Sequence, residues 1–184
     1  MSFENDEQLA ARAIEDRAYD QAVRLLRPLA ERNSEYALLT LGWIYETGAT
    51  GVPDKDVARS FYEHAVTQGS ATACLYLGWL LLTCGDETEA KAAFECGFQR
   101  GNHECKSELQ RLADYADEKT VANLLEQESF KEALRLLRPL AERNSEYALL
   151  CLGHIFETGL TGVPDMDTAR SCYQRAAAQG RGPA

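Results

Sequence analysis

The sequence predicts an all-α solenoid, in which helix pairs are stacked in tandem. The run RLLRPLAERNSEYALL occurs twice without a change, at residues 24–39 and at residues 135–150. When this duplication is extended in both directions, residues 19–69 align with residues 130–180, and 36 of the 51 aligned positions are identical. No stretch of useful length alternates apolar and polar residues as a strand would, so the repeated units are predicted to be helical.

A shorter period lies inside the duplication. The Leu-Gly pair at residues 41–42 recurs at residues 77–78, a step of 36 residues, whereas the two long copies lie 111 positions apart. The longer spacing is therefore about three units of 37 residues, a period that is typical of a solenoid.

The first helix of each unit is predicted from its caps and its apolar stripe. Ser34 is an N-cap candidate, and Gly48 can end the helix because glycine accepts a positive φ. Four residues between them recur at helical spacing and form one apolar stripe: Ala37, Leu41, Ile44 and Tyr45.

The second helix follows a turn at residues 51–54. Pro53 cannot continue the first helix, Asp54 can cap the second, and Gly69 ends it. The stripe of this helix consists of Ala58, Phe61, Tyr62 and Ala65. Small residues such as Gly42 are expected to let the two helix axes approach each other.

The chain is accordingly expected to form one α-solenoid over residues 1–184. The expected parts are units at 4–33, 34–69 and 70–101, an irregular helical segment at 102–115, units at 116–144 and 145–180, and a tail at 181–184. Within residues 102–127 the apolar residues change helical phase, which indicates either two helices or one helix kinked near Asp117. We favour the break.

Pro28 and Pro139 lie within helical segments and are expected to bend them, since an interior proline costs about 3 kcal/mol.

The repeat pattern A-x-x-x-L-G-x-x-Y-x-x-G-x-x-G-V-P resembles the Sel1-like repeat of bacterial proteins, a relative of the tetratricopeptide repeat. In the first copy it is carried by Ala37, Leu41, Gly42, Tyr45, Gly48, Gly51, Val52, Ala58, Tyr62, Ala65 and Gly69. In the second copy it is carried by Ala148, Leu152, Gly153, Phe156, Gly159, Gly162, Val163, Ala169, Tyr173, Ala176 and Gly180. The resemblance implies a right-handed α/α superhelix whose concave side is lined by the first helices.

Composition restricts the classes of partner. There are 19 basic and 29 acidic residues, which give a net charge of −10 and a pI near 4.8. Nucleic acid and anionic membrane are poor partners for such a surface, whereas a basic protein is permitted.

The polar N-terminus has no signal-peptide core, so we expect a cytoplasmic protein. Its six cysteines, at positions 74, 84, 96, 105, 151 and 172, are then expected to be reduced and buried.

The sequence contains little that indicates chemistry. None of the three histidines has a Cys or Ser partner at a spacing that suggests a nucleophile, and no glycine-rich phosphate loop is present. Cys96, His103 and Cys105 fit no standard zinc spacing and are interpreted as ordinary residues with buried thiols. Some secreted Sel1-like proteins are linked with β-lactams, but the chain has no Ser-x-x-Lys. We expect no enzyme activity, no metal and no cofactor.

The candidate binding residues lie on the first helices, at positions that correspond between units. Trp43, Trp79 and His154 are equivalent and could form a ladder of anchors, because aromatic residues dominate binding hot spots. Packing between repeats is the competing role for the two tryptophans. The complete candidate set is Tyr36, Thr40, Trp43, Tyr76, Trp79, Tyr147, Cys151 and His154.

These features favour a protein-interaction scaffold that binds a peptide or protein segment on its concave face. One alternative is a dedicated inhibitor, such as an immunity-type protein that neutralises one partner. The least favoured alternative is an enzyme that acts on cell-wall or β-lactam compounds. At the C-terminal repeat, Phe61 is replaced by Cys172 and Val66 by Ala177, which fits an end unit. Self-association through this repeat and truncation of a longer array both remain open.

Overall fold

The computed structural model describes residues 3–179, which form an all-α repeat solenoid. The described residues contain ten helices and no strand. The chain divides into two compact units, Met1–Leu109 and Gln110–Ala184, and each unit is described by itself.

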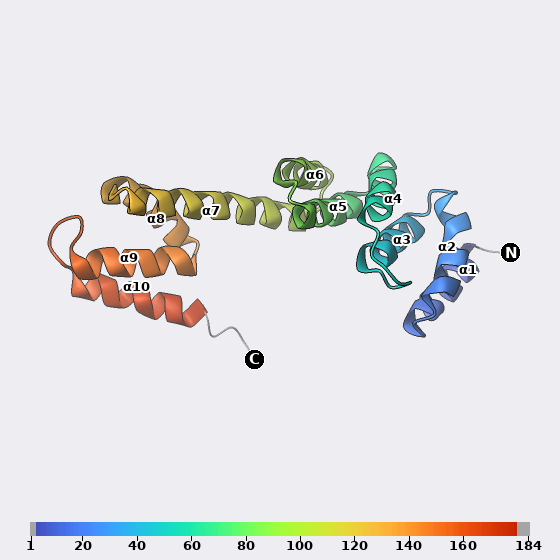
Figure 1. The fold of residues 1–184 in the computed structure, drawn as a ribbon, viewed down its shortest axis with the longest axis horizontal. Coiled ribbons are helices and arrows are strands. Elements are labelled where there is room, and N and C mark those ends of the chain that lie inside the picture. The colour runs from blue at the N-terminus through green and yellow to red at the C-terminus, as the bar shows by residue number, and fades with distance from the viewer. Residues whose placement is uncertain (1–2, 180–184) are drawn as a thin grey trace. The chain divides into compact units, whose positions relative to one another are not determined.

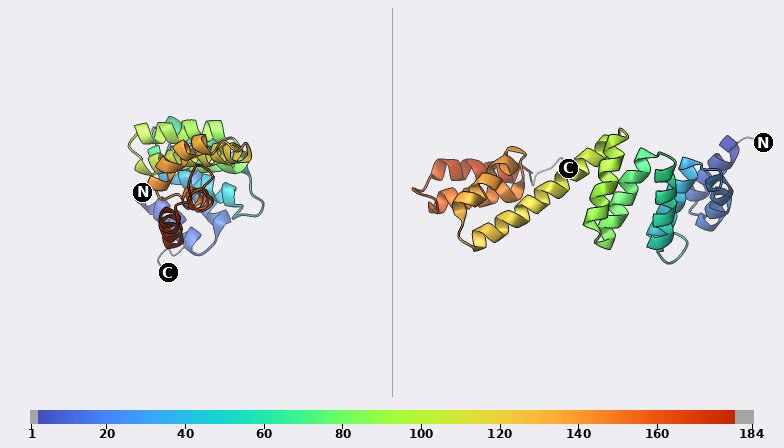
Figure 2. Two further views of the ribbon diagram at one scale, coloured as in Figure 1. Left: turned by 90° about the vertical axis from the view of Figure 1, so that its left-hand side faces the viewer. Right: turned by 90° about the horizontal axis from the view of Figure 1, so that it is seen from above.

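The first unit is built from helix pairs. Its helices are α1 (Phe3–Glu15), α2 (Tyr19–Ala30), α3 (Glu35–Thr47), α4 (Lys55–Thr67), α5 (Ala71–Cys84) and α6 (Glu87–Gln99). The most extensive contacts join α1 to α2, α3 to α4 and α5 to α6, and each pair also contacts the next through α2–α3 and α4–α5 (Figures 1 and 2). The fold class predicted from the duplication and its period is confirmed.

The second unit contains most of α7 (His103–Glu126), followed by α8 (Phe130–Glu142), α9 (Glu146–Thr158) and α10 (Met166–Gln179). Helices α9 and α10 form a close pair, and α8 packs on α9 (Figure 1). This second pair repeats the architecture of α3 and α4, as the duplication predicts.

The break that we favoured near Asp117 does not occur, because α7 is a single helix through that position. No glycine or proline lies between His103 and Glu126, so nothing in the backbone interrupts the helix. The change of phase has a different cause, which is that the two ends of α7 are buried in different units. Cys105 is fully buried in the first unit, and Val121 is fully buried in the core of the second.

The predicted caps of the repeats are confirmed. The Ser34 hydroxyl accepts a hydrogen bond from the Ala37 amide at 3.2 Å, and a carboxylate oxygen of Asp54 accepts one from the Val57 amide at 3.0 Å. Gly48 ends α3 in the left-handed conformation, with φ of 68°. These side-chain acceptors satisfy amides that a helix start otherwise leaves unpaired.

Both prolines lie in the last turn of their helices, and asparagine ends that turn in each copy. Asn33 and Asn144 each have φ of 62°. The residue after each asparagine closes the turn, since the Ser34 amide donates to the Leu29 carbonyl and the Ser145 amide to the Leu140 carbonyl, both at 3.0 Å. This pattern is the Schellman motif, with asparagine in the position that glycine usually takes. The bend expected at Pro28 and Pro139 stays a prediction.

Close approach of the two helices in the pairs α3–α4, α5–α6 and α9–α10 depends on a glycine beneath an aromatic ring. A Cβ atom added to Gly42 would lie 2.7 Å from Cδ1 and 2.8 Å from Cζ of the Tyr62 ring, which is fully buried. The same relation joins Gly78 to Phe94 and Gly153 to Tyr173. The ring therefore occupies the space that a larger residue would need, as the sequence predicted for Gly42.

Gly42→Ala is expected to lower the free energy of unfolding by up to about 2 kcal/mol, because the added methyl group overpacks a buried contact at a cost of about 1–3 kcal/mol. The overpacking exceeds the gain of about 1 kcal/mol that alanine brings to a helix. Urea denaturation of the full chain measures the change.

Gly162→Ala is the matched control, because no atom lies within 4 Å of the added Cβ and the position needs no positive φ. It should leave the unfolding midpoint almost unchanged. Equal effects of the two substitutions would contradict the packing argument.

Candidate interaction surface

In the first unit, one face of α3 carries three of the predicted site residues. Tyr36, Thr40 and Trp43 are spaced four and three residues apart, so they lie on the same side of the helix. Together with Leu39 and with Tyr76 from α5, they line a pocket of about 300 Å³. Tyr36 is 37% exposed and Trp43 is 40% exposed, so both rings are partly available to a partner.

The aromatic residues of this face also contact one another. The ring centroids of Trp43 and Tyr19 are 6.1 Å apart, and Tyr76 meets the edge of Trp79 at 5.7 Å. Tyr76 stacks on the buried Tyr62 at 5.8 Å as well. Trp79 is half-buried behind Tyr76 and does not line the pocket. The tryptophans thus pack against their neighbours, and Trp43 in addition leaves part of its ring exposed.

In the second unit, the other three predicted residues line a larger pocket of about 690 Å³. Tyr147, Cys151 and His154 lie on α9, at the positions that Tyr36, Thr40 and Trp43 occupy on α3. The remaining lining residues are Leu125, Glu126, Glu128, Phe130, Leu150, Ile155 and Leu160. The structure therefore gathers the predicted residues into two groups, one in each unit.

Two of the residues that line the second pocket differ from their counterparts in the first copy. Trp43 packs against Tyr19 in the first unit, whereas the equivalent residues in the second unit are His154 and Phe130. The imidazole is smaller than the indole, so it fills less of the space beside the aromatic ring of the preceding helix. The first pocket is closed by α5 of the next repeat, and the second is closed by α7, α8 and the loop residue Leu160.

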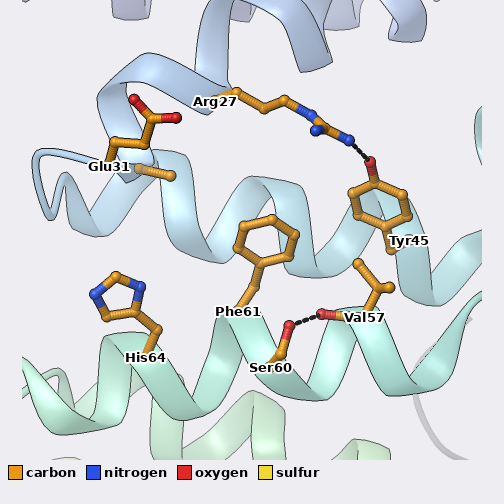
Figure 3. A pocket seen from close by; sticks show the side chains of 8 residues that line it. Arg27, Glu31, Tyr45, Val57, Ser60, Phe61 and His64 are labelled. Carbon is orange, nitrogen blue, oxygen red and sulfur yellow. Dashed lines mark hydrogen bonds between the residues drawn. The ribbon is translucent and has the colours of Figure 1, made fainter.

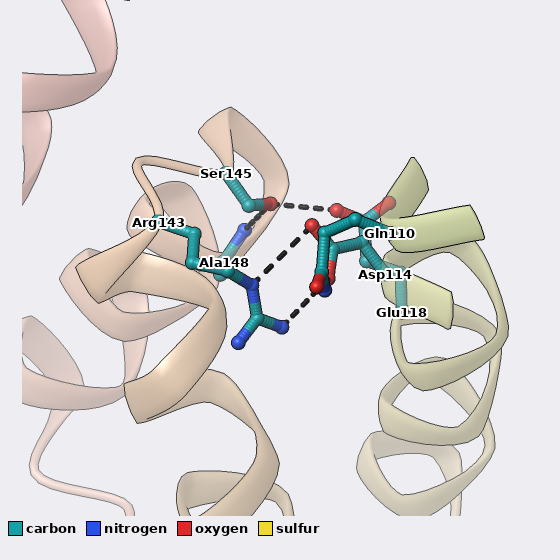
Figure 4. A network of polar contacts seen from close by, with 6 residues as sticks. All are labelled: Gln110, Asp114, Glu118, Arg143, Ser145 and Ala148. Atoms are coloured by element: carbon teal, nitrogen blue, oxygen red, sulfur yellow. Dashed lines mark hydrogen bonds and ion pairs between the residues drawn. The ribbon is translucent and has the colours of Figure 1, made fainter. Parts of the chain in front are cut away.

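A polar network joins α7 to the start of α9 and positions this second pocket (Figure 4). The Arg143 guanidinium lies 2.6 Å from the Asp114 carboxylate, which raises the pKa of Arg143 above its usual value. The Ser145 hydroxyl caps α9 by accepting from the Ala148 amide and donates to Glu118 at 2.6 Å. The helix start that carries Tyr147 is thus tied to α7 by both contacts.

The phenol and the thiol in the second pocket are uncharged at neutral pH. Burial is the main cause that raises the pKa of Tyr147 to about 12, and its neighbour Cys151 adds to the shift. Burial also raises the pKa of Cys151. The formal charges among the residues lining the pocket are therefore the two carboxylates of Glu126 and Glu128, both on exposed residues. The pocket is apolar inside and acidic at its rim.

Sequence reasoning missed the residues that neighbouring elements contribute to this pocket. They are Leu125, Glu126, Glu128, Phe130 and Leu160, together with Leu150 and Ile155 of α9 itself. A usable signal was present in the differences between the copies, because Ala49 of the first loop corresponds to Leu160 of the second. A bulky apolar residue that replaces alanine in an otherwise conserved loop indicates a new contact.

A further pocket, of about 360 Å³, lies between α2, α3 and α4 of the first unit (Figure 3). Arg27 donates to the Tyr45 hydroxyl at 2.8 Å across it, and Tyr45 stacks on Phe61 with centroids 5.8 Å apart. His64 lies at its other end and pairs with Asn33 at 2.8 Å. Arg27, Ser60 and His64 thus already have hydrogen-bond partners within the protein.

The thiols do not form the reactive or metal-binding cluster that their number might suggest. All six cysteines are free; Cys74, Cys105 and Cys172 are buried, but Cys84 is exposed, so the expectation of six buried thiols is wrong. Cys84 is the last residue of α5, beyond the contact with α6. Among residues 3–179 no group of three or more His, Cys, Asp or Glu side chains could hold a metal ion. In the same range no helix is long and apolar enough to cross a bilayer.

The fold and its paired pockets define an α-helical repeat protein. The Sel1 repeat model matches residues 36–70 and residues 147–180, which contain the pairs α3–α4 and α9–α10. These two segments, which together make up 69 of the 184 residues, are thus similar to the Sel1 repeat. Proteins with this repeat generally mediate protein–protein interactions and are typically non-catalytic scaffolds.

Two solved structures are similar to the chain. A Sel1 repeat protein from Oxalobacter formigenes is 22% identical, with a TM-score of 0.48, over 86% of this chain and 64% of that protein. A protective antigen of uropathogenic Escherichia coli strains, described as having an SLR fold, is also 22% identical, with a TM-score of 0.45. That match covers 87% of this chain and 34% of the antigen, so the chain spans less than two thirds of either protein. No curated protein matches the chain.

Cys84 is expected to be the first thiol modified when the folded protein is treated with a thiol reagent at pH 8. Burial raises the pKa of Cys74 to about 12, so its reactive thiolate is almost absent at this pH. Cys74 and Cys105 should react only when the chain opens locally. Time-resolved labelling followed by peptide mass spectrometry measures the order.

Cys84→Ser should remove the fastest phase and leave the other phases unchanged. Rapid modification of Cys74 in that variant would mean that its site is accessible and would contradict its burial.

Proposed function

We propose that this protein is a non-enzymatic scaffold that binds a peptide or protein segment on the face formed by the first helices of its repeats. The observation that carries the proposal is that equivalent positions of the two copies each line a pocket. Tyr36, Leu39, Thr40 and Trp43 line the first pocket, and the equivalent Tyr147, Leu150, Cys151 and His154 line the second. Independent repeats that expose partly buried aromatic residues at the same positions suit side-chain recognition.

Preorganisation would supply the affinity. The pockets are lined from helices that are capped at both ends and packed through glycine–aromatic contacts, so their side chains are held before a partner arrives. A binding surface that is already ordered loses little conformational entropy on association. The net charge of −10 favours a partner with a basic surface and disfavours nucleic acid or anionic membrane.

A dedicated inhibitor of one partner protein is the second candidate, and the acidic surface is the observation that favours it. Long-range attraction between an acidic inhibitor and a basic target accelerates association, and added salt screens it. A steep fall of the association rate with salt would support this candidate, whereas a rate independent of salt would exclude it. A cytoplasmic location and self-association through the C-terminal repeat are further parts of the proposal, and sedimentation analysis tests the latter.

Replacing both Trp43 and Trp79 by alanine is expected to weaken partner binding at least about tenfold, as is typical for the loss of aromatic anchors. Affinity capture from the native source with mass spectrometry identifies the partner, and calorimetry with that partner measures the change. Circular dichroism establishes that the variant is folded.

Tyr115→Ala is the matched control, because Tyr115 is an aromatic residue that is 60% exposed on α7 and lines neither pocket. It should leave the affinity unchanged. If the folded double variant binds as tightly as the control, the first helices are not the binding face.

A further inference from the structure

The second pocket has a chemistry of its own, which defines the partner more closely than the proposed function does. Its interior consists of aliphatic and aromatic side chains, namely Leu125, Phe130, Leu150, Ile155 and Leu160, with Tyr147, Cys151 and His154 on one wall. A volume of about 690 Å³ lies within the range of sites that hold drug-sized ligands. It therefore has room for at least one bulky apolar side chain.

A smaller pocket of about 360 Å³, lined mostly by polar residues, adjoins this one within the same unit. The two share Glu128, Phe130 and Leu160, and the second is lined in addition by Ser129, Lys131, Glu132 and Thr161. The two pockets together are thus lined by three carboxylates and one ammonium group. The excess negative charge favours a cationic group next to the apolar side chain.

One rim position differs in the sign of its charge between the two units, although residues 15–21 and 126–132 each contain three acidic residues and one basic residue. Arg17 and Glu128 occupy equivalent loop positions, with φ of 56° and 57°, and both loops are closed by the same backbone hydrogen bonds. The duplication therefore replaced a cation by a carboxylate at one position and Trp43 by His154 at another. Both changes act on one pocket, since the first makes its rim acidic and the second leaves its interior open.

We propose that the pocket around His154 binds a peptide segment in which a bulky apolar residue is followed by a basic residue. This inference rests on the proposed function. The apolar side chain would enter between α7, α8 and α9, and the basic side chain would lie over Glu128 and Glu132. A partner of this chemistry matches both the apolar interior and the acidic rim, whereas an acidic peptide would match only the first.

The test uses variants that import residues from the first copy, so each replacement is one that this backbone already accepts. His154→Trp fills the interior, and Glu128→Arg reverses the charge at the rim. Tyr115→Ala is the control, because Tyr115 is 60% exposed on α7 and lines neither of these pockets. The probes are pools of fluorescent ten-residue peptides with random flanks around a fixed pair, either Phe-Arg, Ala-Arg or Phe-Glu. Fluorescence polarisation with the full chain measures their affinity.

The Phe-Arg pool is expected to bind at least about tenfold more tightly than either of the other pools. His154→Trp should reduce that affinity about tenfold or more, whereas Tyr115→Ala should leave it almost unchanged. Glu128→Arg should weaken the Phe-Arg pool and strengthen the Phe-Glu pool.

Three results would overturn the inference. If the pools bind but His154→Trp and Glu128→Arg change nothing, while alanine at Trp43 and Trp79 abolishes binding, the proposed function stands without this pocket. If no pool binds, peptide recognition itself is wrong. If His154→Trp abolishes a concentration-dependent dimer seen by sedimentation, the pocket is covered by a second copy of the chain.

Discussion

In the pairs α3–α4, α5–α6 and α9–α10, a glycine of the first helix lies against an aromatic ring of the second helix, and the repeat architecture depends on this contact. Tyr62 over Gly42, Phe94 over Gly78 and Tyr173 over Gly153 bring each pair of helix axes together. In two of the pairs the tyrosine hydroxyl also donates to a glutamate of the first helix, as Tyr62 does to Glu46 at 2.8 Å. Because the second helix is fixed in this way, the opposite face of the first helix is left to form the pockets.

A second recurring contact links one repeat to the next. The serine that caps a first helix also donates to a glutamate of an earlier helix, as Ser34 does to Glu7, Ser70 to Glu35 and Ser145 to Glu118. One hydroxyl therefore serves the helix start and the contact between neighbouring helices at the same time. This double role of the serine hydroxyl keeps the register of successive first helices constant. The side chains on those helices therefore keep a constant spacing.

Duplication followed by local divergence accounts for the two pockets. The helix caps and the glycine contacts of the α3–α4 pair were retained in the α9–α10 pair. Several of the substitutions between the copies fall at the pocket, where Trp43 corresponds to His154, Ala49 to Leu160 and Tyr19 to Phe130. The framework is therefore common to both units, whereas the interior of the pocket is specific to each.

The sequence by itself determined the helix pairs, their caps and the positions of the candidate site residues. Ser34, Gly48 and Asp54 could be predicted because a cap depends only on residues within one turn. The continuity of α7 and the composition of the second pocket were decided by the tertiary structure. Burial of Cys105 and Val121 in different units cannot be read from the helical phase alone. Likewise Glu128 and Leu160 join the His154 pocket only because loops distant in the sequence meet at α9.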